Sequence, residues 1–158
     1  MADENMLFAT EDQLENPEEQ LVEVQTDKYL IFASDDLLYG IDADQVVEII
    51  TNHTITYLPR VPHYVRGIIN LRGQLIPILD IRMRLGKMPG DKYCLVVVNV
   101  GGDQIGILVD GVEKMVDVPN EDIMPMPTQN SEKMISGMCS LADGGTMLVL
   151  DCELLIHD

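Results

Sequence analysis

The sequence lacks tryptophan and contains only two phenylalanines, so a hydrophobic core has to be built from aliphatic side chains and methionine. It also lacks any run of about 18–20 apolar residues, the length that a membrane-spanning helix requires. The N-terminus has neither a basic start nor an apolar run, so no signal peptide is predicted. With 158 residues, 46% of them hydrophobic, the chain can still bury a substantial core.

Positive charge is scarce. The chain has 10 Lys and Arg against 27 Asp and Glu, which gives a net charge of −17. Nucleic acids and anionic membrane surfaces attract basic proteins, so this balance argues against both as partners. The acidic excess is most marked in residues 1–27, which contain no Lys or Arg. We predict that this segment is a solvated, flexible tail, with a recruitment motif as the alternative.

Cysteine is also rare and forms no CxxC pair. Cys94, Cys139 and Cys152 are an odd, scattered set, which is typical of buried thiols in a reduced, cytoplasmic protein. The three histidines show no metal-ligand spacing with one another or with a cysteine. No metal or other cofactor is therefore predicted.

From Lys28 onward, short apolar runs alternate with turn residues, a pattern typical of many short strands. "YLIFAS" and "LLYGID" are predicted to form one hairpin, "YCLVVVNV" and "IGILVD" a second, and "CSLADGG" and "TMLVLD" a third. Helical periodicity is brief. The best candidate is "DADQVVEII", where Asp42 or Asp44 would cap a turn.

The first two hairpins are similar enough to indicate a duplication. Lys28-Tyr29 matches Lys92-Tyr93 at a spacing of 64, and Gly40-Ile41 matches Gly106-Ile107 at a spacing of 66. Two extra residues in the second turn would account for the change in spacing. The alternative is chance similarity between apolar hairpins.

The later halves of the two copies also match, since "IPILDI" aligns with "MLVLDC". We therefore interpret residues 28–86 and 92–156 as two barrel-forming repeat units of about five strands each. A unit of some 60 residues buries too little apolar surface alone, so the two should pack on each other.

Motifs of nucleophilic catalysis, phosphate binding and zinc hydrolysis are absent, which argues against an enzyme. Asp80, Asp110 and Asp151 each follow an apolar run. Such carboxylates either act in catalysis or metal binding, or cap the following turn by accepting backbone N–H groups. Because they recur at equivalent places of the repeat, we favour capping.

All of the arginines stand between residues 60 and 84, within the most apolar stretch of an acidic chain. Arg72 precedes Gly73 in a predicted tight turn, "NLRGQ", anchored by the leucines on either side. An arginine on a rigid turn either contacts a carboxylate of a partner or forms an internal salt bridge. Composition alone leaves both interpretations open.

The segment "VRGIINLRGQLIPILDIRMRLG", residues 65–86, closely resembles the hallmark segment of the CheW family, the coupling proteins of bacterial chemotaxis. The similarity continues in "YGIDADQVVEII" before it and in "GILVDGVEKMVDVPNEDI" after it, which assigns residues 28–158 to a CheW-like domain. The resemblance implies a mainly β fold of two five-stranded SH3-like β-barrels packed on each other, with a few short helical turns. The repeat suggests the same architecture independently.

The resemblance further implies a non-enzymatic adaptor that couples the cytoplasmic tips of methyl-accepting chemotaxis receptors to the regulatory domain of the histidine kinase CheA. Such an adaptor would be monomeric alone, would not insert into the membrane, and would work in receptor arrays at the inner face of the membrane through its partners.

Matching the family's motifs places receptor contacts on Val46, Glu48 and Ile49 of "QVVEII", on Gly67 of "VRGI" and on Arg72 of "NLRG". A receptor tip is a helical hairpin, and it is expected to dock in a groove between the barrels. Arg72 would lie at the groove rim, held by Glu48. The kinase-binding residues follow no short motif, and none is assigned.

Two other functions stay open at this point. One is the same adaptor role in a kinase pathway of surface motility, and the other is a small-ligand-binding module that uses the cleft between the barrels. Two features depart from the family pattern: the acidic tail is long, and the end at "LLIHD" leaves little room for the C-terminal helix often present.

Overall fold

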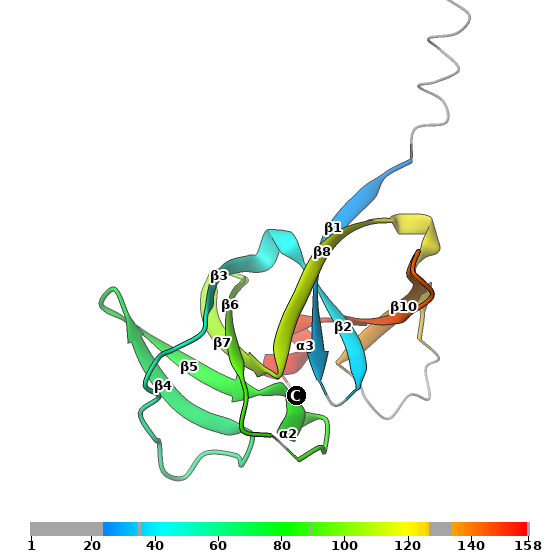
Figure 1. Ribbon diagram of the computed structural model, residues 1–158. Coiled ribbons are helices and arrows are strands. Elements are labelled where there is room, and N and C mark those ends of the chain that lie inside the picture. Colours follow the sequence, from blue (N-terminus) through cyan, green and yellow to red (C-terminus); the bar gives the residue numbers. More distant parts are fainter. Residues whose placement is uncertain (1–23, 35, 89, 127–133, 158) are drawn as a thin grey trace, which may run out of the picture.

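The computed structural model describes residues 24–34, 36–88, 90–126 and 134–157, which form two curved β-sheets packed on each other (Figure 1). In chain order the elements are β1 (Thr26–Ser34), β2 (Leu37–Asp42), the 3-10 turn η2 (Ala43–Gln45), β3 (Val46–Ile50), β4 (Val65–Leu71), β5 (Gln74–Asp80), α2 (Ile81–Arg84), β6 (Cys94–Val100), β7 (Asp103–Val109), β8 (Gly111–Pro119), the 3-10 turn η3 (Asn120–Asp122), β9 (Met124–Pro125), β10 (Ile135–Ser140), β11 (Thr146–Leu150) and α3 (Cys152–His157). The mainly β fold with a few short helical turns is confirmed.

The strand order reveals how the repeat is assembled. One sheet has the order β3-β6-β7-β5-β4, and the other has the order β8-β1-β2-β11-β10, extended by the two-residue strand β9. Each sheet therefore combines the first hairpin of one repeat unit with the remaining strands of the other. The two orders become identical when the units are interchanged, which is strong support for a duplication. The expected one-barrel-per-unit arrangement differs from this, because the hairpins are exchanged between the units.

The ladders also correct the alignment of the first strands. Ser34 pairs with Leu37 in the first hairpin, and Val100 pairs with Asp103 in the second, so both turns contain two residues. The second turn therefore has no extra residues, and the spacing of 66 applies to the whole hairpin. The Lys-Tyr match at a spacing of 64 is coincidental.

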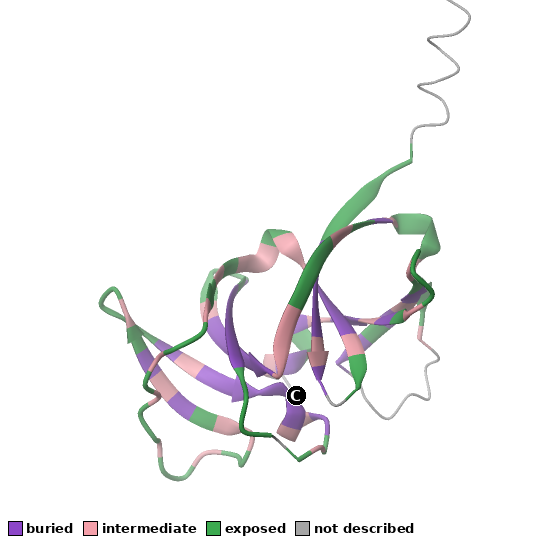
Figure 2. Ribbon diagram, in the orientation of Figure 1, coloured by how far each residue is buried: buried purple, intermediate pink, exposed green. Residues whose placement is uncertain are grey.

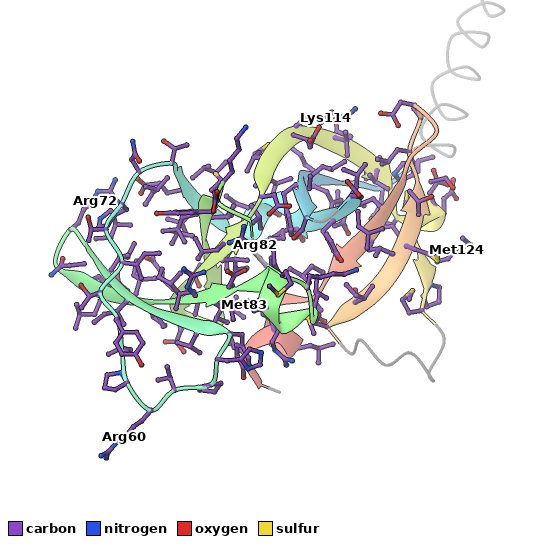
Figure 3. All side chains as sticks on the ribbon, turned by 60° about the horizontal axis from the view of Figure 1, so that its bottom comes forward. Arg60, Arg72, Arg82, Met83, Lys114 and Met124 are labelled. Carbon is purple, nitrogen blue, oxygen red and sulfur yellow. The ribbon has the colours of Figure 1, made fainter. Side chains whose placement is uncertain are left out.

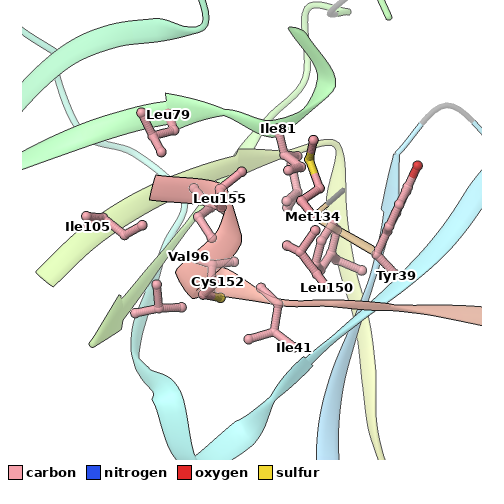
Figure 4. Packing of buried hydrophobic residues seen from close by; sticks show 14 of the residues in the cluster. Tyr39, Ile41, Leu79, Ile81, Val96, Ile105, Met134, Leu150, Cys152 and Leu155 are labelled. Atoms are coloured by element: carbon pink, nitrogen blue, oxygen red, sulfur yellow. The ribbon is translucent and has the colours of Figure 1, made fainter. Parts of the chain in front are cut away.

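Three apolar clusters follow from the alternation of side chains along the strands. One lies within each sheet's curve, and the largest lies between the sheets. Figure 2 marks the buried residues of the strands in purple. In β6, Val97 faces the inside of its own sheet, whereas its neighbours Val96 and Val98 face the other sheet. This explains why β6 reads as an almost continuous apolar run. Figure 4 shows the shared cluster, where Leu155 of α3 and Ile81 of α2 meet residues of both sheets.

The predicted caps are confirmed at three aspartates. Asp42 Oδ1 accepts from the backbone N of Asp44, Asp80 Oδ1 accepts from that of Arg82, and Asp151 Oδ1 accepts from that of Glu153. Asp110 differs, because its carboxylate accepts from a guanidinium group of Arg82. The "DADQVVEII" segment forms only the 3-10 turn η2 and then continues as β3.

The ends of the domain lie close to their expected positions. Strand β1 begins at Thr26, two residues before the expected boundary at Lys28, and residues 1–23 of the predicted tail lie outside the described residues. At the other end, α3 does form, and its Leu155 is buried against the shared core. The short C-terminus therefore still supplies a packing element.

The three thiols are predicted to be chemically silent while the protein is folded. Cys94, Cys139 and Cys152 are buried and free. Burial raises the pKa of all three, and that of Cys152 to about 12, with nearby Asp151 and Asp42 adding to the effect. The thiolate is the nucleophile, so at pH 8 we expect no reaction with a thiol reagent until denaturant is added, after which all three should react. Rapid reaction of one thiol in the native protein would contradict this.

Candidate functional site

An exposed ion pair joins two of the residues predicted to contact a receptor. Arg72 Nη1 donates to Glu48 Oε1 at 2.7 Å, and Arg72 Nη2 donates to Glu48 Oε2 at 3.1 Å. The Arg72 side chain is 70% exposed and that of Glu48 is 29% exposed. An exposed pair of this kind contributes little to stability, but its two parallel bonds fix the direction of the guanidinium group.

The backbone under Arg72 is unusual. Leu71 pairs with Gln74, so Arg72 and Gly73 form a two-residue turn, and both have positive φ, 54° and 86°. Such turns favour Asn or Gly at the first position, and an L-residue there costs about 1–2 kcal/mol. The equivalent turn of the other hairpin in this sheet uses two glycines, Gly101 and Gly102. A side chain held on this turn at a cost in backbone energy makes Arg72 a candidate for a functional role.

The hydrogen bond to Arg72 lowers the pKa of Glu48, and the same bond raises the pKa of Arg72. Because the carboxyl pKa is lowered, the pair is fully formed above the ordinary pKa of a glutamate and is lost only as pH falls through the lowered value. The pair is therefore intact at neutral pH.

Strand β3 adds apolar surface beside this pair. Ile49 is 39% exposed, whereas Val46 is half-buried against the shared core. Val47, which the sequence did not single out, is 45% exposed. It is the extra residue of a β-bulge, since Val46 pairs with Val98 and Glu48 with the next residue, Val97. The bulge itself cannot be read from alternation along one strand, although exposure still alternates from Val46 to Ile50, with Val47 and Ile49 exposed.

Gly67 is buried and offers no side chain to a partner. Its φ is +146°, and a Cβ at this position would lie 2.0 Å from the carbonyl oxygen of Thr56. The next residue, Ile68, exchanges two backbone hydrogen bonds with Thr56, of 2.8 and 2.9 Å. Gly67 therefore allows the segment after β3 to pair with β4. This contact and the Glu48–Arg72 pair together join the two edges of the five-stranded sheet.

The other arginines, which sequence reasoning left unexplained, have three different environments. Arg60 extends from a loop into solvent at a φ of 63° (Figure 3). Arg84 lies over the ring of Tyr64, with 4.9 Å between its Cζ and the ring centroid. Arg66 and Arg82 belong to an ion network centred on a buried carboxylate.

The centre of this network is the carboxylate of Asp80, which is 0% exposed. Arg82, 2% exposed, donates to it through Nε at 2.9 Å and through Nη2 at 3.0 Å. Arg66 Nη1 donates to Asp80 Oδ2 at 2.8 Å. Arg82 Nη1 also donates to Asp110 Oδ1 and to the carbonyl oxygen of Lys92. Burial disfavours the charged guanidinium of Arg82, yet the bonds to Asp80 and Asp110 raise its pKa.

The second sheet carries a counterpart of the exposed pair with the charges reversed. Lys114 Nζ lies 3.2 Å from Asp143 Oδ2. Lys114, on β8, occupies the place that Glu48 has on β3, and Asp143 lies in the β10–β11 turn as Arg72 lies in the β4–β5 turn. Of these two pairs, Glu48–Arg72 in the five-stranded sheet is therefore the one that presents a cation on a hairpin turn.

A groove of about 480 Å³ lies elsewhere, between β5, β7 and the end of α3. Its apolar lining includes Leu75, Pro77, Ile105 and Leu155. None of the five predicted receptor-contact residues lines it. The structure brings Glu48 and Arg72 together, with Val46 and Ile49 on the same strand as Glu48, and it places Gly67 beneath Thr56.

A profile of the CheW-like domain matches residues 28–158. The chain belongs to the CheW family. It is 32% identical over 136 residues to the chemotaxis protein CheW of Klebsiella aerogenes, an alignment that covers 82% of this chain and 81% of that protein. It is 30% identical over 103 residues to protein FrzA of Myxococcus xanthus, covering 63% of this chain and 64% of FrzA.

A solved CheW-family structure has the same fold. The crystal structure of the scaffolding protein TtCheW from Thermoanaerobacter tengcongensis aligns with a TM-score of 0.75 and 27% identity, over 80% of this chain and 89% of that one. The family is one of chemotaxis scaffold proteins. Among the described helices, none is long and apolar enough to cross a membrane. Within the same described ranges, no group of three or more His, Cys, Asp or Glu side chains is placed to hold a metal ion.

Proposed function

We propose that this CheW-family protein is a non-enzymatic adaptor that binds the cytoplasmic tips of chemoreceptors and couples them to the histidine kinase CheA. The observation that carries the proposal is the Arg72 side chain, exposed on a strained turn and aimed by Glu48. Exposed Val47 and Ile49 lie on the same strand as Glu48. An arginine beside apolar side chains suits the docking of an amphipathic helix that carries a carboxylate.

In this proposal Arg72 supplies the polar contact with the receptor helix, and strand β3 supplies the apolar contact. Two donors of Arg72 bind Glu48, which leaves further N–H groups of the guanidinium free to bind a carboxylate on the receptor helix. The valine and isoleucine of β3 supply apolar contact. Gly67 acts through the backbone, because its side-chain position is filled by Thr56.

Replacing Arg72 by glutamate tests this site. We expect the variant to fold, to retain binding of the CheA regulatory domain, and to lose at least tenfold in affinity for a receptor-tip hairpin, because a charge-assisted hydrogen bond contributes about 1.5–3 kcal/mol. The matched control is Arg60→Glu, since Arg60 is also exposed at a positive φ of 63°. Titration calorimetry with the purified hairpin measures both affinities.

A charge swap separates direct contact from internal pairing. In the double variant Arg72→Glu with Glu48→Arg, the ion pair is restored but the cation moves from the turn to the strand. We expect receptor binding to stay weak in this variant. Recovery of wild-type affinity would show that only the pair matters, and would remove Arg72 from the receptor contact.

A second candidate is the same adaptor role in a kinase pathway other than flagellar chemotaxis. The similarity to FrzA, a relative whose name differs from that of the chemotaxis proteins, favours keeping it. Affinity capture from the source cell's lysate, followed by mass spectrometry, distinguishes the two by the kinase and receptors recovered. Recovery of neither a kinase nor a receptor by the folded protein would contradict both.

A further inference from the structure

The internal repeat provides a comparison within one molecule. Asp80 and Asp151 follow equivalent strands, and each caps the short helix after it. In the second unit, however, Ser136 stands at the position of Arg66, and Glu153 stands at that of Arg82. Asp151 caps α3 through two backbone N–H groups without an arginine nearby in sequence. The cap itself therefore does not require Arg66 or Arg82, and these two arginines must serve something else in the first unit.

Arg66 lies at a position where it can control strand register. It is the extra residue of a β-bulge, since Val65 pairs with Leu79 and Gly67 with the next residue, Ile78. The second unit has the same bulge, with Ser136 as its extra residue, and there the Ser136 hydroxyl donates to the carbonyl oxygen of Val149 at 3.5 Å. What distinguishes the first unit is therefore an ionic anchor of the bulged residue in place of a single hydroxyl bond. A bulge sets the register of the remaining strand, and a slip of one residue would turn every later side chain to the opposite face. The register after Arg66 determines where Gly67 meets Thr56 and where the Arg72–Gly73 turn falls at the end of the hairpin.

The ion network anchors this bulge to buried structure. Arg66 bonds the carboxylate of Asp80, and the Asp80 backbone N donates to the carbonyl oxygen of Tyr64 at 2.7 Å. Asp80 is in turn held by the fork of Arg82, whose other end bonds Asp110 and the Lys92 carbonyl. A carboxylate bound by so many donors in a buried site has little freedom to move. The bulged residue is therefore tied to a fixed point.

We infer that Arg66 is a positioning residue for receptor docking: through Asp80 it holds the β4 bulge in the register that places Gly67 and Arg72. This inference rests on the proposed function, because the site it positions is the proposed receptor surface. Arg66 acts on the partner through the backbone of β4, and the buried Asp80–Arg82 pair supplies the rigid support.

The test compares Arg66→Ala and Arg66→Lys with Arg60→Ala, an exposed arginine of a nearby loop, all in the full chain. Two quantities are measured: the affinity for the receptor-tip hairpin at several salt concentrations, and amide hydrogen exchange at Gly67 and Ile68. We expect Arg66→Ala to weaken receptor binding about tenfold and to speed exchange at both amides, as the loss of a charge-assisted bond implies. Arg66→Lys should recover most of both effects, and kinase binding should not change.

Other outcomes would overturn the inference. Unchanged exchange together with weaker and less salt-dependent receptor binding would make Arg66 a direct contact. Unchanged receptor affinity in Arg66→Ala would show that the bulge needs no anchor. If the wild-type chain itself fails to bind the hairpin, both the proposed function and the role of Arg66 in receptor docking are wrong. The exchange data would still show whether Arg66 fixes the bulge.

Discussion

Replacing Arg82 by alanine is expected to lower the free energy of unfolding by about 3–5 kcal/mol, a large share of the 5–15 kcal/mol that holds a typical domain folded. Arg82 is 2% exposed and makes two bonds to the fully buried carboxylate of Asp80. Without it, the cationic partner that Asp80 keeps among the described residues is Arg66, which is partly exposed. The cost arises mainly from leaving a buried charge poorly compensated rather than from the worth of the pair itself.

The matched control is Arg84→Ala, two residues further along the same short helix. Arg84 stacks over the ring of Tyr64, and loss of a partly exposed cation–π contact should cost about 0.5–2 kcal/mol. Urea denaturation of the wild type and the variants measures the free energy of unfolding of each. Arg82→Lys should lose less stability than Arg82→Ala but more than Arg84→Ala, because an ammonium group keeps the charge but lacks the two parallel bonds of the guanidinium. A loss below about 1 kcal/mol in Arg82→Ala would contradict the central role of the network.

The strands of this protein could be predicted from the sequence, but their partners could not. Short apolar runs between turn residues identified the three hairpins, and "IPILDI" with "MLVLDC" identified the repeat. Periodicity reports which residues of a strand share a face, but it carries no information about the neighbouring strand. The exchange of hairpins between the repeat units therefore became visible only in the ladders.

For the arginines, too, the sequence predicted some features and not others. Arg72 was identified from its turn and from the family motif, and its partner Glu48 is 24 residues away. The network of Arg66, Asp80, Arg82 and Asp110 stayed hidden, because its bonds span 14 and 28 residues as well as a local pair. A buried arginine also contradicts the usual preference of charged side chains for the surface. The sequence clue was the concentration of all arginines in the most apolar stretch, which indicated that they were needed there without showing by what.

Val47 marks the limit of motif matching in the candidate site. Alternation along "QVVEII" would place Val46 and Glu48 on one face and Val47 on the other. Exposure does alternate in this way, and Val47 is 45% exposed. The bulge at Val47 changes the packing instead, because Val46 packs against the shared core whereas Ile50 packs against the cluster inside its own sheet. Bulges depend on the pairing of two strands, so a single strand's sequence does not reveal them.

Gly67→Ala is expected to have the second large effect, and it would act on stability and on receptor binding together. The new methyl group would lie 2.0 Å from the carbonyl oxygen of Thr56, which is backbone and cannot rotate away. A φ of +146° is also unfavourable for any L-residue. We expect the Thr56–Ile68 pairing to break, with a loss of roughly 3 kcal/mol or more, since strain of about 1–3 kcal/mol is added to the steric clash and the lost hydrogen bonds.

Gly73→Ala is the matched control for this prediction. Gly73 also has a positive φ, of +86°, but nothing lies within 4 Å of its Cβ position, so only the backbone term of about 1–2 kcal/mol applies. Comparing the two variants by thermal unfolding and by amide exchange at Ile68 isolates the effect of the contact with Thr56. An equal loss of stability in both variants would mean that the positive φ alone accounts for the need for glycine at position 67. It would also mean that the segment after β3 moves away from the new methyl group at little cost. A larger loss in Gly67→Ala, with weaker receptor binding, would show that this glycine serves the site by letting the two edges of the sheet meet.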